Sequence, residues 1–404
     1  MRVRVRIAHR VGAAVALALC ALAGCAPEPV PAPAPTPVAP TTSAPLSPEQ
    51  RRLERATGLV DAWTPRERAA SVVMSTISTA DPAALAAFVH GQGLGGVILM
   101  SGNIPPDPVS LAALTGALTP DAAFPPLIAI DQEGGVVSRL AWDPFPGADS
   151  LKHTDPADTR AAFAGRAALL AEAGVNVNFG VVADVTPDTA SFIYPRALGA
   201  DVDSAAQRVA AAVVGERGIV ASTLKHFPGH GAAPGDSHVG IPTTGLSREE
   251  WEASHRVPFA AGIDAGAELI MFGHLAFSAV DPAPASLSPA WHDIARGDLG
   301  FAGVIVSDDL GMLLDSGLPE YTDLAATTVA ALAAGTDLAL IVRGADEASV
   351  PAVIDTITAA VESGVLPAGR LIGQVARGTD KRLRVVLSAD YQRLEFLRVL
   401  RSHE

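Results

Sequence analysis

The sequence predicts an α/β fold, a single (β/α)8 TIM-like barrel that follows a signal peptide and a proline-rich linker. Short runs rich in Val, Ile and Leu alternate with Ala-rich stretches of helical length. Apolar strands that alternate with helices are typical of a parallel sheet covered by helices, and eight such units suit a barrel. The eight runs are 71–77, 95–100, 126–130, 175–182, 222–225, 269–272, 303–306 and 338–342. A doubly wound open sheet is the alternative, because one or two short runs are easily miscounted.

Two of the helical stretches carry a clear stop signal. Residues 205–216 are followed by Gly218, and residues 322–334 are followed by Gly335. Glycine is favoured at that place because it adopts the left-handed conformation that ends many helices.

The composition limits the classes of function. The chain has 404 residues, of which 49% are hydrophobic and 18% are charged, as in globular proteins. It carries 29 Lys and Arg against 43 Asp and Glu, a net charge of -14. A nucleic acid partner is therefore not expected, since nothing offsets the charge of a phosphate backbone.

The first residues indicate export. Four arginines precede an uncharged run at 11–23 that is too short to span a bilayer. The following Leu-Ala-Gly-Cys, which ends at Cys25, resembles a bacterial lipobox. We expect residues 1–24 to be a lipoprotein signal peptide and Cys25 to be lipidated, which places the protein outside the cytoplasm on the cell membrane. A signal peptide without lipidation is the alternative.

A linker and one domain follow the lipidation site. Nine prolines lie between positions 27 and 48 and alternate mostly with Ala and Thr. Such a segment cannot pack a core and is typical of an extended spacer. We therefore assign residues 25–48 to the lipidated Cys and a Pro/Ala-rich linker, and residues 49–404 to one barrel domain.

Polar side chains follow five of the predicted strands, where barrel enzymes carry their chemistry. These are Asp131, Asp184, Lys225-His226, His274 and Ser307-Asp308-Asp309. Helix capping explains a single Asp or Ser at such a place, but it explains neither the lysine nor the histidines. Lys225 ends an apolar strand, where a buried ammonium needs an acceptor, so we expect it to bind a ligand. The alternative is a lysine that snorkels to the barrel rim.

The densest polar segment is a histidine loop. The run Lys-His-Phe-Pro-Gly-His-Gly at 225–231 is followed by Asp236-Ser237-His238. Zinc binding is one interpretation, since histidine and aspartate are zinc ligands, but no HExxH motif is present. Asp236 and His238 are better placed as an orienting pair for acid/base chemistry. We therefore predict no metal and no cofactor.

These residues suggest a glycosidase. Such an enzyme needs a carboxylate on one side of the anomeric carbon and a proton donor on the other. Asp308 is the expected nucleophile, because it is the first acidic group after the strand at 303–306. Asp309 is set at a different angle and is expected to cap the following helix. His238 is the expected proton donor, because histidine titrates near neutral pH.

Three motifs together resemble the β-N-acetylglucosaminidase branch of glycoside hydrolase family 3. They are Asp-Gln-Glu-Gly-Gly at 131–135, the histidine loop with Asp236-Ser237-His238, and Ser-Asp-Asp-Leu-Gly-Met at 307–312. The resemblance extends from about Thr64 to Val342, and the histidine loop is its most specific part. It implies a retaining mechanism in which Asp308 is the nucleophile, His238 the acid/base and Asp236 its partner.

The resemblance also implies a set of sugar contacts. These are Asp131, Arg139, Lys225, His226 and Arg196. His274 lies on a strand end that the family also uses, so it is a further candidate for substrate binding. A buried histidine with satisfied hydrogen bonds is the alternative for that position.

The expected function is exo-hydrolysis of terminal β-linked N-acetylglucosamine from cell-wall (peptidoglycan) fragments or related glycans. The expected partners are that glycan and, through the lipid on Cys25, the membrane. Two alternatives remain. One is a phosphorylase that uses phosphate in place of water, and the other is a non-catalytic sugar-binding lipoprotein. The joint presence of Asp308, Asp236 and His238 argues against the binder, which needs no acid/base pair.

Overall fold

The computed structural model describes residues 46–119, 125–371, 374–375 and 377. These residues belong to one compact unit that begins at Leu46. The predicted signal peptide at 1–24, the lipidation site Cys25 and nearly all of the linker at 25–48 lie outside the described residues. Within the described ranges, no helix is both long and apolar enough to cross a bilayer.

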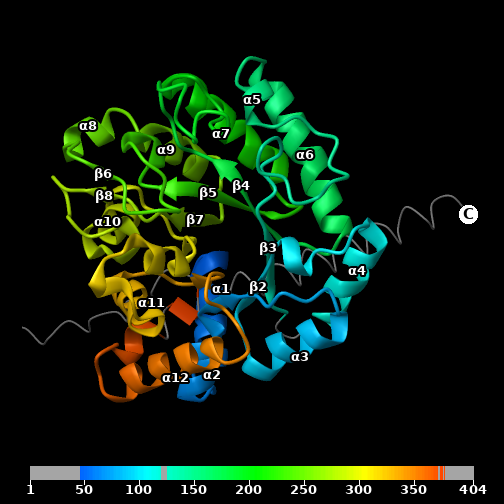
Figure 1. Cartoon of the computed structure of the whole chain (residues 1–404), viewed down its shortest axis with the longest axis vertical. Coiled ribbons are helices and arrows are strands. Elements are labelled where there is room, and N and C mark those ends of the chain that lie inside the picture. The colour runs from blue at the N-terminus through cyan, green and yellow to red at the C-terminus, as the bar shows by residue number, and fades with distance from the viewer. Residues whose placement is uncertain (1–45, 120–124, 372–373, 376, 378–404) are drawn as a thin grey trace, which may run out of the picture. The chain divides into compact units, whose positions relative to one another are not determined.

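Eight parallel strands form the barrel, in the order β10-β1-β2-β3-β4-β5-β7-β9 (Figure 1). They are β1 (Val73–Ser75), β2 (Gly96–Leu99), β3 (Leu127–Ile130), β4 (Val177–Val182), β5 (Ala221–Phe227), β7 (Leu269–Phe272), β9 (Val304–Ser307) and β10 (Ala339–Ile341). A parallel bridge between Val306 and Leu338 joins the two ends of the sheet. Each strand coincides with one predicted apolar run. The predicted barrel is therefore confirmed, and the open sheet is wrong.

Helices cover the outside of the strands (Figure 1). They are α1 (Pro48–Val60), α2 (Pro65–Ser71), α3 (Pro82–Gln92), α4 (Pro108–Ala117), α5 (Ala148–Leu151), α6 (Pro156–Glu172), α7 (Val202–Glu216), α8 (Arg248–Glu252), α9 (Arg256–Asp264), α10 (Pro289–Asp293), α11 (Leu324–Ala334) and α12 (Ser349–Glu362). The two predicted stop signals are confirmed: Gly218, with a φ of 77°, lies two residues after the end of α7, and Gly335, with a φ of 140°, directly follows α11. Short helical turns complete the loops. They are η1 (Ser101–Asn103), η2 (His230–Ala232), η3 (Ala285–Leu287), η4 (Ile294–Asp298), η5 (Leu310–Ser316) and η6 (Pro319–Tyr321).

The core has an inner and an outer layer because successive strand residues point to opposite faces. One buried cluster, which includes Met74, Ile98, Phe179 and Leu340, draws side chains from the barrel strands and fills the interior. Two further clusters bury the outer faces of the strands against the helices. The strand ends are therefore held in a rigid frame.

A small sheet that the sequence did not predict lies beside the barrel. Strand β6 (Thr243–Thr244) pairs in parallel with β8 (Ala276–Phe277). The histidine loop runs from the end of β5 to β6, so this pairing fixes its far end next to the chain that leaves β7. Both ends of the loop are thereby attached to the barrel.

Candidate active site

A cavity of about 120 Å³ opens where the barrel strands end. Its wall is formed by Asp131, Glu133, Val137, Arg139, Phe192, Arg196, Lys225, His226, His230, Ser237, His238, Met271 and Asp308. Seven of the nine predicted catalytic or sugar-binding residues are in this set. The structure thus brings them together at the end of the barrel that the sequence predicted. Their individual roles stay predictions.

Lys225 lies at the centre of the polar wall. Its Nζ is 3.0 Å from Oδ1 of Asp131 and 2.7 Å from Oε1 of Glu133. The lysine side chain is only 2% exposed, so the snorkelling alternative is wrong. Burial by itself lowers the pKa of Lys225, but the two carboxylates outweigh it and raise the pKa above its usual value. The ammonium therefore stays charged.

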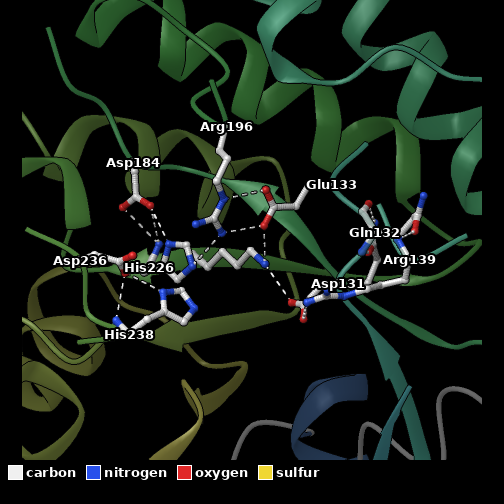
Figure 2. A network of polar contacts seen from close by, with 11 residues as sticks. Asp131, Gln132, Glu133, Arg139, Asp184, Arg196, His226, Asp236 and His238 are labelled. Carbon is white, nitrogen blue, oxygen red and sulfur yellow. Dashed lines mark hydrogen bonds and ion pairs between the residues drawn. The ribbon is translucent and has the colours of Figure 1, made fainter. Parts of the chain in front are cut away.

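Glu133 connects Lys225 to Arg196 (Figure 2). Its Oε1 is 2.7 Å from Nη2 of Arg196, and its Oε2 is 3.0 Å from Nε, a two-pronged ion pair. Burial by itself raises the pKa of Glu133, but Lys225 and Arg196 outweigh it and lower the pKa. Glu133 was not among the predicted site residues. Its signal was its place in the motif, two residues after Asp131.

Asp131 also contacts Arg139. The Nη2 of Arg139 is 3.2 Å from Oδ2 of the aspartate. Burial raises the pKa of Asp131, but Lys225 and Arg139 outweigh this effect and lower it to about 2. This end of the cavity therefore presents fixed charges of both signs, an arrangement suited to hydrogen bonds with several sugar hydroxyls.

Asp184 holds the start of the histidine loop (Figure 2). Its carboxylate accepts hydrogen bonds from the backbone N–H of His226 and of His230, and its Oδ2 is 2.7 Å from Nδ1 of His226. The Nε2 of His226 is 3.2 Å from Nη2 of Arg196. A guanidinium can only donate, so Nε2 accepts and the proton is assigned to Nδ1. Asp184 therefore fixes both the ring orientation and the tautomer of His226.

Asp308 directly follows β9. Its backbone N–H donates to the carbonyl of Phe272 at 2.8 Å, and its Oδ1 accepts from the backbone N–H of Asp309 at 2.8 Å. Burial raises the pKa of Asp308, but nearby positive charge, that of Lys225 included, and this hydrogen bond outweigh it and lower the pKa. An ionised carboxylate on the cavity wall is what a glycosidase nucleophile requires.

The neighbouring Asp309 has a different environment. Its carboxylate accepts from the backbone N–H of Gly311 at the start of η5, as predicted for a capping residue, and from those of Val342 and Arg343 after β10. Burial raises its pKa to about 6. All three hydrogen bonds direct Asp309 toward the backbone, so Asp308 is the better placed nucleophile.

His238 and Asp236 form a pair on the far part of the histidine loop (Figure 2). The Nδ1 of His238 is 2.6 Å from Oδ1 of Asp236, and the same oxygen accepts the backbone N–H of His238 at 2.9 Å. The two side chains are 49% and 41% exposed. His238 lines the cavity with Asp308, whereas Asp236 faces the adjoining loop at 186–192. The bond at Nδ1 leaves Nε2 available for proton exchange.

The structure corrects the substrate contact predicted for His274. This side chain is fully buried, and it does not line the cavity. Its Nδ1 is 2.7 Å from Oγ of Ser286, and its Nε2 is 2.8 Å from the carbonyl oxygen of Asp309. Both ring nitrogens are therefore satisfied, as in the alternative interpretation. His274 supports the backbone next to the nucleophile.

Phe192 and His230 also form part of the cavity wall, although neither was among the predicted catalytic or sugar-binding residues. Their rings meet edge to face with centroids 4.9 Å apart, and Phe192 also lies 6.4 Å from the ring of His238. His230 is buried, which lowers its pKa to about 4, so its imidazole is neutral. Within the described ranges, neither of its ring nitrogens has a hydrogen-bond partner. In the sequence, only the histidine-rich run points to His230 as a site residue, and no motif points to Phe192.

A metal site was the other interpretation of the histidine loop. Among the residues that the structure describes, no group of three or more His, Cys, Asp and Glu side chains is arranged to hold a metal ion. His226 and His238 each have a carboxylate at Nδ1 instead. This geometry favours acid/base chemistry.

Comparisons with known proteins agree with the geometry. A family model described as the glycosyl hydrolase family 3 N terminal domain matches residues 66–379. A beta-hexosaminidase of Stenotrophomonas maltophilia (strain K279a) is 34% identical over 305 residues, which are 72% of this chain and 87% of that protein. A beta-hexosaminidase of Pseudomonas aeruginosa (strain LESB58) is 37% identical over 256 residues, which are 61% of this chain and 75% of that protein.

Solved structures show the same fold. A glycoside hydrolase family 3 beta-N-acetylglucosaminidase from Paenibacillus sp. str. FPU-7 matches with a TM-score of 0.74 and 31% identity, over 80% of this chain and 63% of that one. M tuberculosis LpqI matches with a TM-score of 0.73 and 28% identity, over 81% of this chain and 96% of that one. The chain therefore belongs to glycosyl hydrolase family 3 and is a glycoside hydrolase of the β-N-acetylhexosaminidase class.

Proposed function

We propose that the protein is a retaining exo-β-N-acetylglucosaminidase that removes terminal β-linked N-acetylglucosamine from peptidoglycan fragments or related glycans. One observation carries the proposal: an ionised carboxylate, Asp308, and His238, whose Nδ1 is paired with Asp236, line the same cavity. A carboxylate and a proton donor at one sugar site are the two groups that a retaining glycosidase needs.

In the first step, Asp308 attacks the anomeric carbon and forms a glycosyl ester. The bond to the leaving oxygen breaks, and that oxygen takes the proton from Nε2 of His238. In the second step, His238 removes a proton from water, the water oxygen attacks the anomeric carbon, and Asp308 leaves as a carboxylate. Asp236 holds Nδ1 of His238 throughout and stabilises the ring when it is charged. Two displacements return the β-anomer.

The polar wall supports action at a chain end. Asp131, Arg139, Lys225 and Arg196 place charged donors and acceptors close together, where they can bind several hydroxyls of one sugar. Arg139, Lys225 and Arg196 each form an ion pair with Asp131 or Glu133, so these side chains are held in place before the sugar arrives. Such fixed partners suit the free hydroxyls of a terminal residue.

The direct test is turnover of a chromogenic β-N-acetylglucosaminide beside the matching β-glucoside. We expect turnover of the first, with the second slower by a large factor, and release of free N-acetylglucosamine from peptidoglycan fragments. Asp308→Ala should abolish turnover of the β-N-acetylglucosaminide and release of N-acetylglucosamine from the fragments, but the variant should still bind the sugar. If the wild-type protein binds the sugar but does not turn over either glycoside, the chain is the sugar-binding protein instead.

A phosphorylase is the second candidate, and the histidine acid/base supports it. A histidine is neutral after it has protonated the leaving group, so it does not repel an incoming phosphate as a carboxylate would. We expect water to be the acceptor, with the same product in the presence and absence of millimolar phosphate. Formation of the sugar 1-phosphate, at a rate that rises with phosphate concentration, would identify a phosphorylase.

We also propose that the protein is anchored outside the cytoplasm by lipid on Cys25. The proposal rests on the sequence alone, because Cys25 lies outside the described residues. Cys25→Ala should move the protein from the membrane fraction to the soluble fraction and leave its turnover unchanged. Detergent partitioning that is the same for both proteins would contradict the anchor.

A further inference from the structure

We propose that Arg343 is a positioning residue that holds the acid/base loop over the cavity by a hydrogen bond to the backbone of His238. The residue follows β10, on the opposite side of the nucleophile strand from the histidine loop in the strand order. Its Nη1 donates to the carbonyl oxygen of His238 at 3.2 Å. This inference rests on the proposed role of His238.

The backbone of Arg343 is fixed next to the nucleophile. Its N–H donates to Oδ2 of Asp309 at 3.1 Å, and Asp309 directly follows Asp308. A Cβ atom added at Gly311 would lie 2.2 Å from the carbonyl oxygen of Arg343, so the chain after the nucleophile packs directly against it. The base of the arginine is therefore tied to the strand that carries Asp308.

The guanidinium is oriented by a second partner. Its Nη1 also forms an ion pair with Oδ2 of Asp315, which lies in η5. Arg343 lines a second hollow of about 190 Å³ beside the cavity, together with His238 and Asp308. Asp315 lines neither that hollow nor the cavity. Asp315, Arg343 and the carbonyl of His238 thus form a chain of contacts that spans from the loop after the nucleophile to the loop that carries the acid/base.

The tip of the histidine loop, residues 234–240, has few hydrogen bonds to the barrel. In the described part of the chain, the bond from Arg343 is the hydrogen bond that joins residues 234–240 to the rest of the barrel, since the others there lie within the loop. Val239 is largely exposed, and Gly235 has a φ of 105°. Without Arg343, His238 would keep its carboxylate partner but lose a fixed distance to the leaving oxygen.

Substrates whose leaving groups differ in acidity can distinguish a positioning role of Arg343 from a general loss of structure. Protonation by His238 matters for a sugar or alkyl leaving group and hardly at all for dinitrophenolate. General acid catalysis contributes roughly 10²- to 10⁴-fold. We expect Arg343→Ala to lower kcat/KM for a disaccharide by about 10- to 100-fold, a part of that contribution. For a dinitrophenyl glycoside, kcat/KM should stay within about threefold.

Azide gives an independent readout. With the dinitrophenyl substrate, the second step still needs His238 as a base, so kcat should fall in Arg343→Ala and recover when azide replaces water as the nucleophile. Asp315→Asn should show the same pattern more weakly, and it keeps the proposal testable if Arg343→Ala does not fold. Arg248→Ala is the matched control, because Arg248 also forms exposed ion pairs and its side chain is 43% exposed, against 37% for Arg343.

A double-mutant cycle with His238→Ala decides how Arg343 acts. If Arg343 works through His238, Arg343→Ala changes kcat/KM by less than about twofold in the His238→Ala background. A full loss in that background would show a direct contact with substrate, and equal losses for all leaving groups would show a structural role. Either result overturns the proposal. If His238→Ala itself lacks the leaving-group pattern, the acid/base assignment fails instead.

Discussion

Lys225 and Glu133 form an ion pair inside the barrel mouth, with Nζ 2.7 Å from Oε1 and both side chains only 2% exposed. Removing two charges from water is costly, and a buried ion pair is weak evidence for stability. Here each partner has a second ion pair, to Asp131 and to Arg196. The cluster is therefore better understood as a charged surface that is prepared for a polar ligand.

Replacement of Lys225 by Met should destabilise the protein most at neutral pH. Ionised Asp131 and Glu133 would each lose one cation, at a cost on the order of 3 kcal/mol. In the wild type, the pKa values of both carboxyls are lowered, that of Asp131 to about 2, so their contribution is present above the ordinary values near 4 and is lost as the pH falls below them. The cost should therefore be smaller at about pH 3 than at pH 7. Chemical denaturation at both pH values measures it, and an equal cost at both would contradict the charge account.

Asp308 and Asp309 should respond in opposite ways to replacement by Ala. Asp308→Ala should lower kcat by about 10³-fold or more, as for other single catalytic groups, and leave the free energy of unfolding nearly unchanged. Asp309→Ala leaves three backbone N–H groups without their acceptor, at a cost of about 2–4 kcal/mol in stability. Thermal unfolding and turnover of each variant measure the two effects. If the Asp309→Ala variant is stable but inactive, Asp309 is the nucleophile and Asp308 is not.

Glu216 should make stability fall as the pH rises. It is fully buried at the end of α7, its Oε1 accepts from Asn178 at 2.6 Å, and burial raises its pKa from 4.5 to about 8. Between these values the folded protein keeps a proton that the unfolded chain has released, so the free energy of unfolding drops by up to about 1.4 kcal/mol per pH unit. Glu216→Gln does not titrate, so its stability relative to the wild type should increase from pH 5 to pH 8. If the free energies of unfolding of the wild type and Glu216→Gln change with pH in parallel, Glu216 is ionised in the folded protein.

Exhaustive chelation should leave activity intact. His226 and His238 each have a carboxylate at Nδ1, the arrangement of an acid/base or orienting histidine. The measurement is turnover after dialysis against a chelator, with and without added zinc. Loss of activity that zinc restores would return the histidine loop to the metal interpretation.

The barrel was predictable because its strands are short apolar runs that are buried on both faces, a pattern that is independent of tertiary detail. The pair β6 and β8 was not predictable, since two residues such as Thr243 and Thr244 carry no periodic signal. The polar side chains at strand ends were also predictable. A charged lysine at the end of an apolar strand destabilises the fold unless an acceptor lies close to it. In the structure, Asp131 and Glu133 are these acceptors.

The contacts that support the site residues were harder to predict from the sequence. His274 and His226 both come at the ends of apolar runs, and both are buried, but only His226 lines the cavity. The ring of His274 is held by Ser286 and by the backbone of Asp309 instead. Asp184 appeared as a polar strand end, but its bonds to the histidine loop depend on how the loop folds back. Arg343 lies 105 residues from the loop that it contacts, and no local pattern marks such a pair.

The central claim is a covalent intermediate on Asp308, and mass spectrometry of the trapped protein tests it most directly. A fluorinated N-acetylglucosaminyl fluoride that retains its acetamido group should form the ester quickly and release it slowly. We predict one added sugar on the intact wild-type protein, none on Asp308→Ala, and a modified peptide in which Asp308 carries the sugar. A label on Asp309, or rapid turnover of the inactivator by Asp308→Ala, would contradict the account.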